Sequence, residues 1–341
     1  MAKHKLAHLV NLHAGGEKTV EQKRADSDAI EEVHDLCKSP SIDYHLFIVD
    51  PTDPHTLDAL FDFNPDSNAV HGGDTTFQHY LQGMMELEQR STIAMIPSGT
   101  GDDGSAILGF RSDSKDQAIR QAETRRAGID AFAIYIKAIS EGKAPTNVKP
   151  IDIMKATAYF EGHDVRTLYA LSSISLGISA ASGKIHDTEG ISYNGAFWKS
   201  FMGAKAVFAN IMIDGVNYDR YLFDMSATNG EIFGNGLPIN PGAVGDDGVG
   251  NVALISPHTD KKGLIHKLSG FVRLGKAFKE LAKGKDVRRD WLTRATYENH
   301  LIVTLSKYHG IELQTDGRHH GKAHKVDLEV LPKNMQFVYS N

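Results

Sequence analysis

Short apolar runs alternate with segments of helical spacing through the first third of the chain. The apolar runs predict strands at 6–12, 44–50, 68–71 and 92–101. Segments whose apolar positions recur at helical spacing lie between them, at 21–37, 55–63 and 77–87. Strands that alternate with helices over short connections are typical of a doubly wound α/β domain with a parallel sheet. Ligands of such a sheet bind beyond the carboxyl ends of its strands.

The pattern changes after about residue 150. Strand-like runs rich in β-branched and aromatic residues follow at 166–178, 205–215, 218–230 and 249–255. Turn-rich connections at 183–195 and 235–250 separate some of them, and a helical pair at about 262–284 and 288–294 precedes three closing strands. We therefore expect two domains: an α/β domain over 1–150 and a mainly antiparallel β-sandwich domain over 151–322.

Composition and charge limit the classes of function that the sequence allows. The formal net charge of the 341 residues is −6, which argues against sequence-independent binding of nucleic acid. Cys37 is the only cysteine, so no disulfide forms within the chain. No run approaches the ~20 apolar residues that span a bilayer, and the first 16 residues are too polar for a secretory signal. We expect a cytoplasmic protein, with peripheral contact at the inner membrane face left open.

The third predicted strand enters one glycine-bearing loop, and the fourth ends in another. Gly72, Gly73 and Asp74 form the first, and Gly99, Thr100 and Gly101 form the second. Glycine lets the backbone approach a phosphate closely, and the N–H groups that begin the next helix then face the anion. A Gly-Gly-Asp sequence also occurs in plain surface turns. Two such loops beyond neighbouring strands would face one another, which favours a nucleotide site.

These loops carry a resemblance to the diacylglycerol kinase catalytic-domain family, which includes bacterial lipid kinases and sphingosine kinases. GGDTT at 72–76 matches its G-G-D-G-T loop, GTGDD at 99–103 its G-T-x-N-D loop, and NLHAGG at 11–16 its opening N-P-x-x-G-G. Asp152 resembles an aspartate that enters the second domain, and 229–254 and 315–335 resemble the family's D-D-G and closing patterns. The order of these matches along the chain makes the set specific.

The resemblance implies a two-domain, ATP-dependent kinase with a fold shared with NAD kinase and phosphofructokinase. Residues 323–341 would return to the first domain. The residues implied in ATP binding are Thr52, Gly72, Gly73, Asp74, Thr75, Thr76, Phe77, Gln78, Gly99, Thr100, Gly101 and Asp103. The residues implied in holding Mg²⁺ are Asp247, the carbonyls of Val244 and Val249, and Asp152 in a network with Asp74 and Asp103.

The implied reaction is attack of a lipid hydroxyl, such as that of diacylglycerol, on the γ-phosphate of ATP. It belongs to lipid metabolism and phospholipid biosynthesis. Asp74 and Asp316 are the candidate catalytic residues, and the partner is a lipid or another hydroxyl-bearing small molecule, with a homodimer left open.

Two residues at the expected site differ from the family's pattern. Thr75 stands where the family has glycine, and a β-branched residue resists a positive φ. Arg318 stands where bacterial lipid kinases have the glutamate proposed as base, and arginine stays protonated. His319, His320 and His324 follow it and are expected to be exposed loop histidines, the alternatives being a metal site or a substitute base.

Two functions remain open: an active lipid kinase, or a pseudokinase that binds nucleotide or lipid in a regulatory or scaffolding role. A third interpretation, an enzyme like NAD kinase or phosphofructokinase, fits the D-D-G turn and the closing D-L-E-V-L-P less well.

Overall fold

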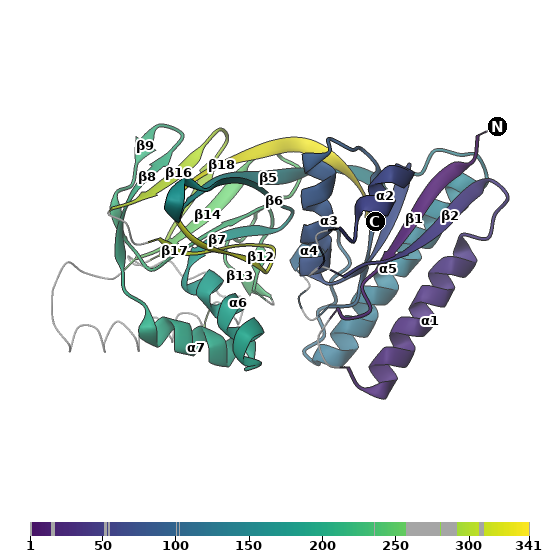
Figure 1. Ribbon diagram of the computed structural model, residues 1–341, viewed down its shortest axis with the longest axis horizontal. Coiled ribbons are helices and arrows are strands. Elements are labelled where there is room, and N and C mark those ends of the chain that lie inside the picture. The colour runs from purple at the N-terminus through teal and green to yellow at the C-terminus, as the bar shows by residue number, and fades with distance from the viewer. Residues whose placement is uncertain are drawn as a thin grey trace. The chain divides into compact units, whose positions relative to one another are not determined.

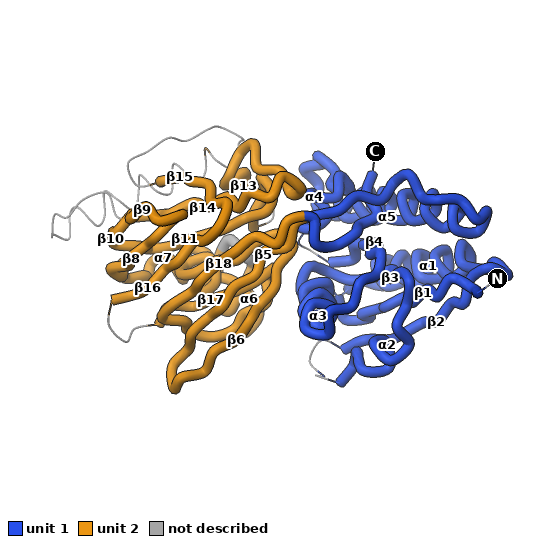
Figure 2. Tube along the Cα trace, turned by 90° about the horizontal axis from the view of Figure 1, so that it is seen from above, with its two compact units in different colours: residues 1–151, 333–341 blue, residues 152–332 orange. Residues whose placement is uncertain are grey.

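The fold is taken from a computed structural model. It describes residues 2–14, 18–50, 53, 55–99, 101, 103–234, 236–256, 280, 292–306 and 310–340. The chain divides into two compact units, Met1–Ile151 with Lys333–Asn341, and Asp152–Pro332 (Figure 2). The first is an α/β unit with a parallel sheet and the second is dominated by antiparallel strands, so the expected fold class is confirmed.

The sheet of the first unit contains the four expected strands (Figure 1). They are β1 (His4–Val10), β2 (Ile42–Ile48), β3 (Ser67–Gly72) and β4 (Thr92–Pro97). Their spatial order is β2–β1–β3–β4, all neighbours are parallel, and the end of β18 pairs with β4 through Phe337 and Ile93. The consecutive strands β3 and β4 are therefore neighbours, and their carboxyl ends lie at one edge.

The described residues of this unit form five helices: α1 (Val20–Leu36), α2 (Asp58–Phe63), α3 (Asp74–Glu86), α4 (Asp103–Ile107) and α5 (Gln117–Ser140). Local capping explains where the two longest begin. Thr19 and Gln22 form a capping box at the start of α1, and the Asp116 carboxylate accepts hydrogen bonds from the first N–H groups of α5. Helix α3 begins three residues earlier than the predicted helix.

Alternating side chains of β2 show how the helices cover the sheet. The Tyr44 ring contacts His34 of α1, with ring centroids 5.1 Å apart. On the opposite face, the Phe47 ring lies 5.9 Å from that of Phe63 in α2. Helix α5 joins α1 on the first face, and α3 joins α2 on the second, so both faces of the sheet are covered.

The long strands of the second unit are β5 (Val148–Phe160), β6 (Val165–Ala170), β7 (Ser173–Gly177), β8 (Val207–Ile213), β11 (Asp224–Thr228), β14 (Gly250–Ile255), β15 (Leu292–Tyr297), β16 (Leu301–Leu305), β17 (Ile311–Thr315) and β18 (Arg318–Val338). Shorter elements are η1 (Glu161–His163), β9 (Val216–Asn217), β10 (Arg220–Leu222), β12 (Ile232–Phe233) and β13 (Leu237–Pro238). One apolar cluster gathers side chains from most of the long strands, among them Leu176, Met225, Leu254, Val303 and Val326.

Two helices of the second unit occupy a segment that the sequence predicted to be turns. They are α6 (Ile178–Glu189) and α7 (Tyr193–Gly203) (Figure 1), so the prediction of a turn-rich connection over 183–195 is wrong. Gly190 ends α6 in a left-handed conformation, and Ser192 caps α7. The turn-like residues therefore mark helix ends.

The predicted helical pair falls largely outside the described residues. Its last three residues, 292–294, lie in strand β15, so that part of the prediction is wrong.

No helix in the described part of the chain is both long enough and apolar enough to cross a membrane.

Candidate functional site

The two glycine loops lie in backbone contact beyond the carboxyl ends of β3 and β4. A Cβ atom added to Gly99 would lie 2.5 Å from the Gly73 Cα, and one added to Gly73 would lie 3.1 Å from the Gly99 Cα. The Ser98 N–H donates a hydrogen bond of 2.9 Å to the Gly72 carbonyl. Neither glycine has a positive φ. Close approach of the two loops is therefore what requires glycine at both positions.

The first loop leads directly into α3. Gly73 is the N-cap residue, and no side chain caps the helix. A Cβ on Gly72 would lie 2.6 Å from the Thr76 Cβ, so the chain turns too tightly there for a larger residue. The N–H groups and the positive dipole at the start of a helix are suited to a phosphate.

Thr75 occupies the first turn of α3 in a helical conformation. Thr75 therefore does not adopt the positive φ that a β-branched residue resists.

The Asp74 carboxylate reaches from the first loop to the second. Its Oδ1 accepts a long hydrogen bond of 3.4 Å from the Gly104 N–H at the start of α4. A Cβ on Gly101 would collide with Asp74 Oδ2. Asp103 is the first residue of α4, so the structure brings two of the predicted acidic residues to the same pair of loops.

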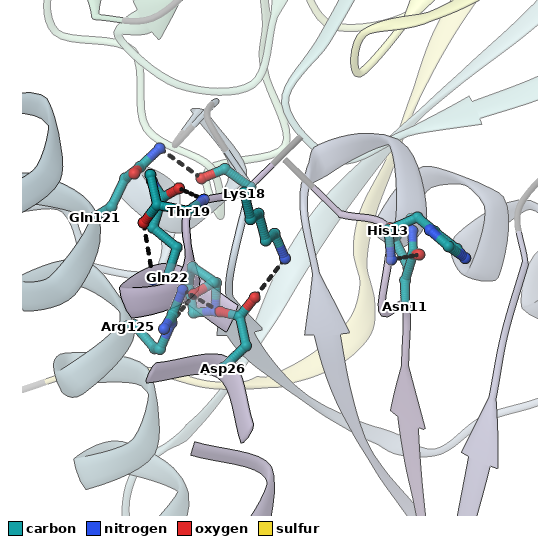
Figure 3. A network of polar contacts seen from close by, with 11 residues as sticks. Asn11, His13, Lys18, Thr19, Gln22, Asp26, Gln121 and Arg125 are labelled. Atoms are coloured by element: carbon teal, nitrogen blue, oxygen red, sulfur yellow. Dashed lines mark hydrogen bonds and ion pairs between the residues drawn. The ribbon is translucent and has the colours of Figure 1, made fainter. Parts of the chain in front are cut away.

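Asn11, the residue that follows β1, connects the end of this strand to helix α3. Its side-chain Nδ2 donates to Thr76 Oγ1 over 2.7 Å. Its Oδ1 accepts from the His13 N–H over 2.9 Å (Figure 3). Asn11 was not among the predicted site residues. It is the asparagine of the NLHAGG motif at 11–16, so the motif could have identified it.

His71 immediately precedes the first loop and is fully buried. Its ring stacks on that of His8, with centroids 5.9 Å apart. Neither ring nitrogen has a hydrogen-bond partner among the described residues. Burial, with the nearby charges of Arg125 and Lys18, lowers the His71 pKa to about 3. The imidazole is therefore neutral at physiological pH.

The remaining predicted nucleotide residues are placed differently. Phe77 and Gln78 are buried, and the Phe77 ring packs 5.8 Å from that of Phe337 inside the first unit. Thr52 and Thr100 lie outside the described residues.

In the second unit, Asp152 holds the turn that contains the D-D-G sequence. Its Oδ2 accepts from the Gly248 N–H over 2.6 Å, and its own N–H donates to the Gly245 carbonyl over 2.8 Å. Asp247 Oδ1 accepts from the Val249 N–H over 2.9 Å. Asp152 is thus bonded to the same turn that contains Val244, Asp247 and Val249.

Asp316 is buried, and four donors surround its carboxylate. They are the N–H groups of Leu171, Ser172 and Ser173, at 2.7, 2.9 and 2.8 Å, and the Ser172 hydroxyl at 2.5 Å. Burial raises its pKa. The carboxylate ties the turn after β17 to the turn before β7, which favours a structural role; its role as a base stays a prediction.

The histidines after Arg318 lie on strand β18 and are partly buried, so the expectation of exposed loop histidines is wrong. His319 Nε2 contacts Glu312 Oε2 at 2.6 Å, and His320 Nε2 contacts Thr315 Oγ1 at 2.7 Å. The His319 contact lowers the Glu312 pKa to about 2. In the part of the chain that the structure describes, no group of three histidine, cysteine or acidic side chains could hold a metal ion.

Two family models match the chain, one in each half. Residues 5–134 match the family model described as diacylglycerol kinase catalytic domain, and residues 172–339 match that described as YegS C-terminal NAD kinase beta sandwich-like domain. A comparison with curated proteins finds no match.

Solved structures share the fold over nearly the whole chain. The crystal structure of a diacylglycerol kinase from Bacillus anthracis str. Sterne has 20% sequence identity and a TM-score of 0.60, and the match covers 99% of this chain and 97% of that one. A second crystal structure from the same organism has a TM-score of 0.65 with the same identity and coverage. Yeast NADH kinase in complex with NADH has 10% identity and a TM-score of 0.54, covering 100% of this chain and 84% of that one.

Proposed function

Because this chain belongs to the diacylglycerol kinase catalytic-domain family, we propose that it transfers the γ-phosphate of ATP to a lipid hydroxyl such as that of diacylglycerol. The contact between the two glycine loops carries the proposal. Gly73, which makes this contact, is also the N-cap residue of α3 and has no side chain to cap the helix, and the Asp74 carboxylate lies beside both loops. This combination suits the phosphates of a nucleotide.

The acidic residues at the loops fit Mg²⁺. Asp74 and Asp103 supply carboxylate oxygens, the ligand type that Mg²⁺ prefers. Mg²⁺ is usually shared between one or two carboxylates and substrate phosphates. When bound, the ion would neutralise charge that develops on the transferred phosphoryl group. Asp152 and the D-D-G turn are proposed as a separate, structural Mg²⁺ site.

Each part of the loop arrangement has a distinct role in the proposal. The first-turn N–H groups of α3 would bind phosphate oxygens, and Asp74 would orient the metal or the attacking hydroxyl. Gly73 and Gly99 would hold the backbones close enough for both loops to contact one nucleotide. Asn11 would keep the β1 turn against α3.

A pseudokinase remains the second candidate, and two observations favour it. Arg318 replaces the residue that the resemblance assigns as base, and the Asp316 carboxylate is already engaged by four donors. Such a protein would bind nucleotide or lipid in a regulatory or scaffolding role without transferring phosphate.

The decisive experiment incubates the purified protein with labelled ATP, Mg²⁺ and separate acceptors: diacylglycerol, a sphingoid base and an isoprenoid alcohol. We expect transfer to a lipid hydroxyl, and we expect Asp74→Asn to abolish it. Asp130→Asn is the matched control, because Asp130 is an exposed residue that pairs with Arg126 on α5. ATP binding without transfer to any acceptor would support the pseudokinase, and an absence of ATP binding would refute the kinase and any pseudokinase that acts through bound nucleotide.

A further inference from the structure

One face of α5 meets the end of β4 and the second glycine loop. Gln121, Arg125 and Gly128 are spaced four and three residues apart, so they lie along the same side of the helix. A Cβ on Gly128 would lie 2.7 Å from the Met95 carbonyl oxygen and 2.9 Å from Pro97 Cδ. Glycine at this position therefore lets α5 approach the end of β4 closely.

The two polar residues on this face bind backbone carbonyls of the loop. Arg125 Nε donates to the Pro97 carbonyl over 3.2 Å. Gln121 Nε2, one turn earlier, donates to the Gly99 carbonyl over 3.1 Å. These carbonyls flank Ser98, whose N–H donates to the Gly72 carbonyl of the first loop. Helix α5 thus holds the second loop from one side, while the first loop contacts it from the other.

Arg125 is itself fixed by a carboxylate of α1. Its NH2 group lies 2.6 Å from Asp26 Oδ1, and Lys18 Nζ pairs with Asp26 Oδ2 (Figure 3). The three side chains are between 9% and 14% exposed, so solvent screens these interactions little. The capping box of Thr19 and Gln22 begins α1 and sets where Asp26 falls on it.

We propose that Arg125 is a positioning residue for nucleotide binding, which holds the second glycine loop against the first and is oriented by Asp26. The planar guanidinium pairs with the Asp26 carboxylate and donates a hydrogen bond to the Pro97 carbonyl at once, which a lysine ammonium on a flexible chain does not reproduce. The expected effect on ATP binding rests on the proposed function, whereas the role of Arg125 in holding the second loop against the first does not.

Hydrogen exchange without nucleotide tests the loop directly. The Ser98 amide reports the loop contact, and the Ile96 amide reports strand β4. In Arg125→Gln we expect Ser98 to exchange about tenfold faster or more, with a smaller change at Ile96, because a charge-assisted hydrogen bond is lost. Arg126→Gln is the control, since Arg126 is the neighbouring arginine, 55% exposed, and pairs with Glu32 and Asp130.

The same variants are then titrated with Mg²⁺ and ATP. We expect Arg125→Gln to weaken ATP binding by about tenfold or more, and Arg125→Lys not to restore it. Gln121→Met removes only the contact to Gly99 and serves as a milder variant should Arg125→Gln fold poorly; it should also speed Ser98 exchange.

Three results would overturn the positioning role: unchanged Ser98 exchange, equal acceleration at Ser98 and Ile96, or wild-type behaviour of Arg125→Lys. If the wild-type protein binds no ATP, the proposed function fails, while exchange at Ser98 still decides the claim about the loop.

Discussion

Replacing Gly99 by alanine tests whether the contact between the two loops is essential. The added Cβ would lie 2.5 Å from the Gly73 Cα, whereas ordinary contact begins at 3.4 Å, so the backbones must separate by about 0.9 Å. Overpacking of this kind costs ~1–3 kcal/mol. If the separated loops no longer fit one nucleotide, ATP affinity should fall by about 5- to 150-fold.

A graded series makes this prediction sharper. In Gly73→Ala the Cβ would lie 3.1 Å from the Gly99 Cα, so a smaller shift suffices and a smaller loss is expected. Gly203→Ala is the control, because no heavy atom lies within 4 Å of the added Cβ and its φ is not positive. Calorimetric titration with ATP and Mg²⁺ measures affinity, and urea unfolding measures stability. Equal affinity and unfolding free energy in Gly99→Ala and Gly203→Ala would refute the reasoning.

Three further changes have defined outcomes. Burial raises the Asp224 pKa from 3.8 to about 6, so the folded state binds the proton more tightly than the unfolded state and loses stability as pH rises from about 4 to 8. Measured by urea unfolding and compared with Asp224→Asn, the free energy of unfolding of the wild type should fall by up to about 3 kcal/mol over this pH range. The Tyr297 hydroxyl is buried without a hydrogen-bond partner among the described residues, so Tyr297→Phe should raise the unfolding free energy by about 1 kcal/mol, and a loss would contradict this. Asn11→Ala removes the bond to Thr76 and should cost about 1 kcal/mol and weaken ATP binding, which the same titration measures; unchanged affinity would separate Asn11 from the site.

The parallel sheet and its glycine loops could be predicted because their signals are local. Each strand is a short apolar run, and Gly72 and Gly99 follow directly after such runs. Consecutive parallel strands are commonly neighbours, so the two loops were expected at one edge. Asp74 then followed from its place beside the glycines.

Helix α6 could not be predicted in the same way, because a distant residue fixes its start. The Ser179 N–H and hydroxyl donate to the two oxygens of Asp224, at 2.8 and 2.6 Å, and Asp224 lies 45 residues further along the chain. Local composition, with glycines at 183, 190 and 195, instead indicated turns.

The roles of Arg125 and Asp316 also depend on distant backbone. Arg125 binds a carbonyl 28 residues earlier, and no motif marks a helix face that contacts main-chain oxygens. The donors to Asp316 come from residues 143 to 145 positions away. A sequence pattern identifies a carboxylate, but it does not show how many of its lone pairs are already occupied.

The chain crosses from one unit to the other twice, and each crossing lies within a β-strand. The first boundary, between Ile151 and Asp152, falls within β5, and the second, between Pro332 and Lys333, falls within β18. A fragment that ends at residue 151 would therefore lack Phe337, which pairs with Ile93 of β4, and would expose the edge of β4 to other chains. Isolating the nucleotide unit calls for joining residues 333–341 back to it, because a single cut leaves an aggregation-prone sheet.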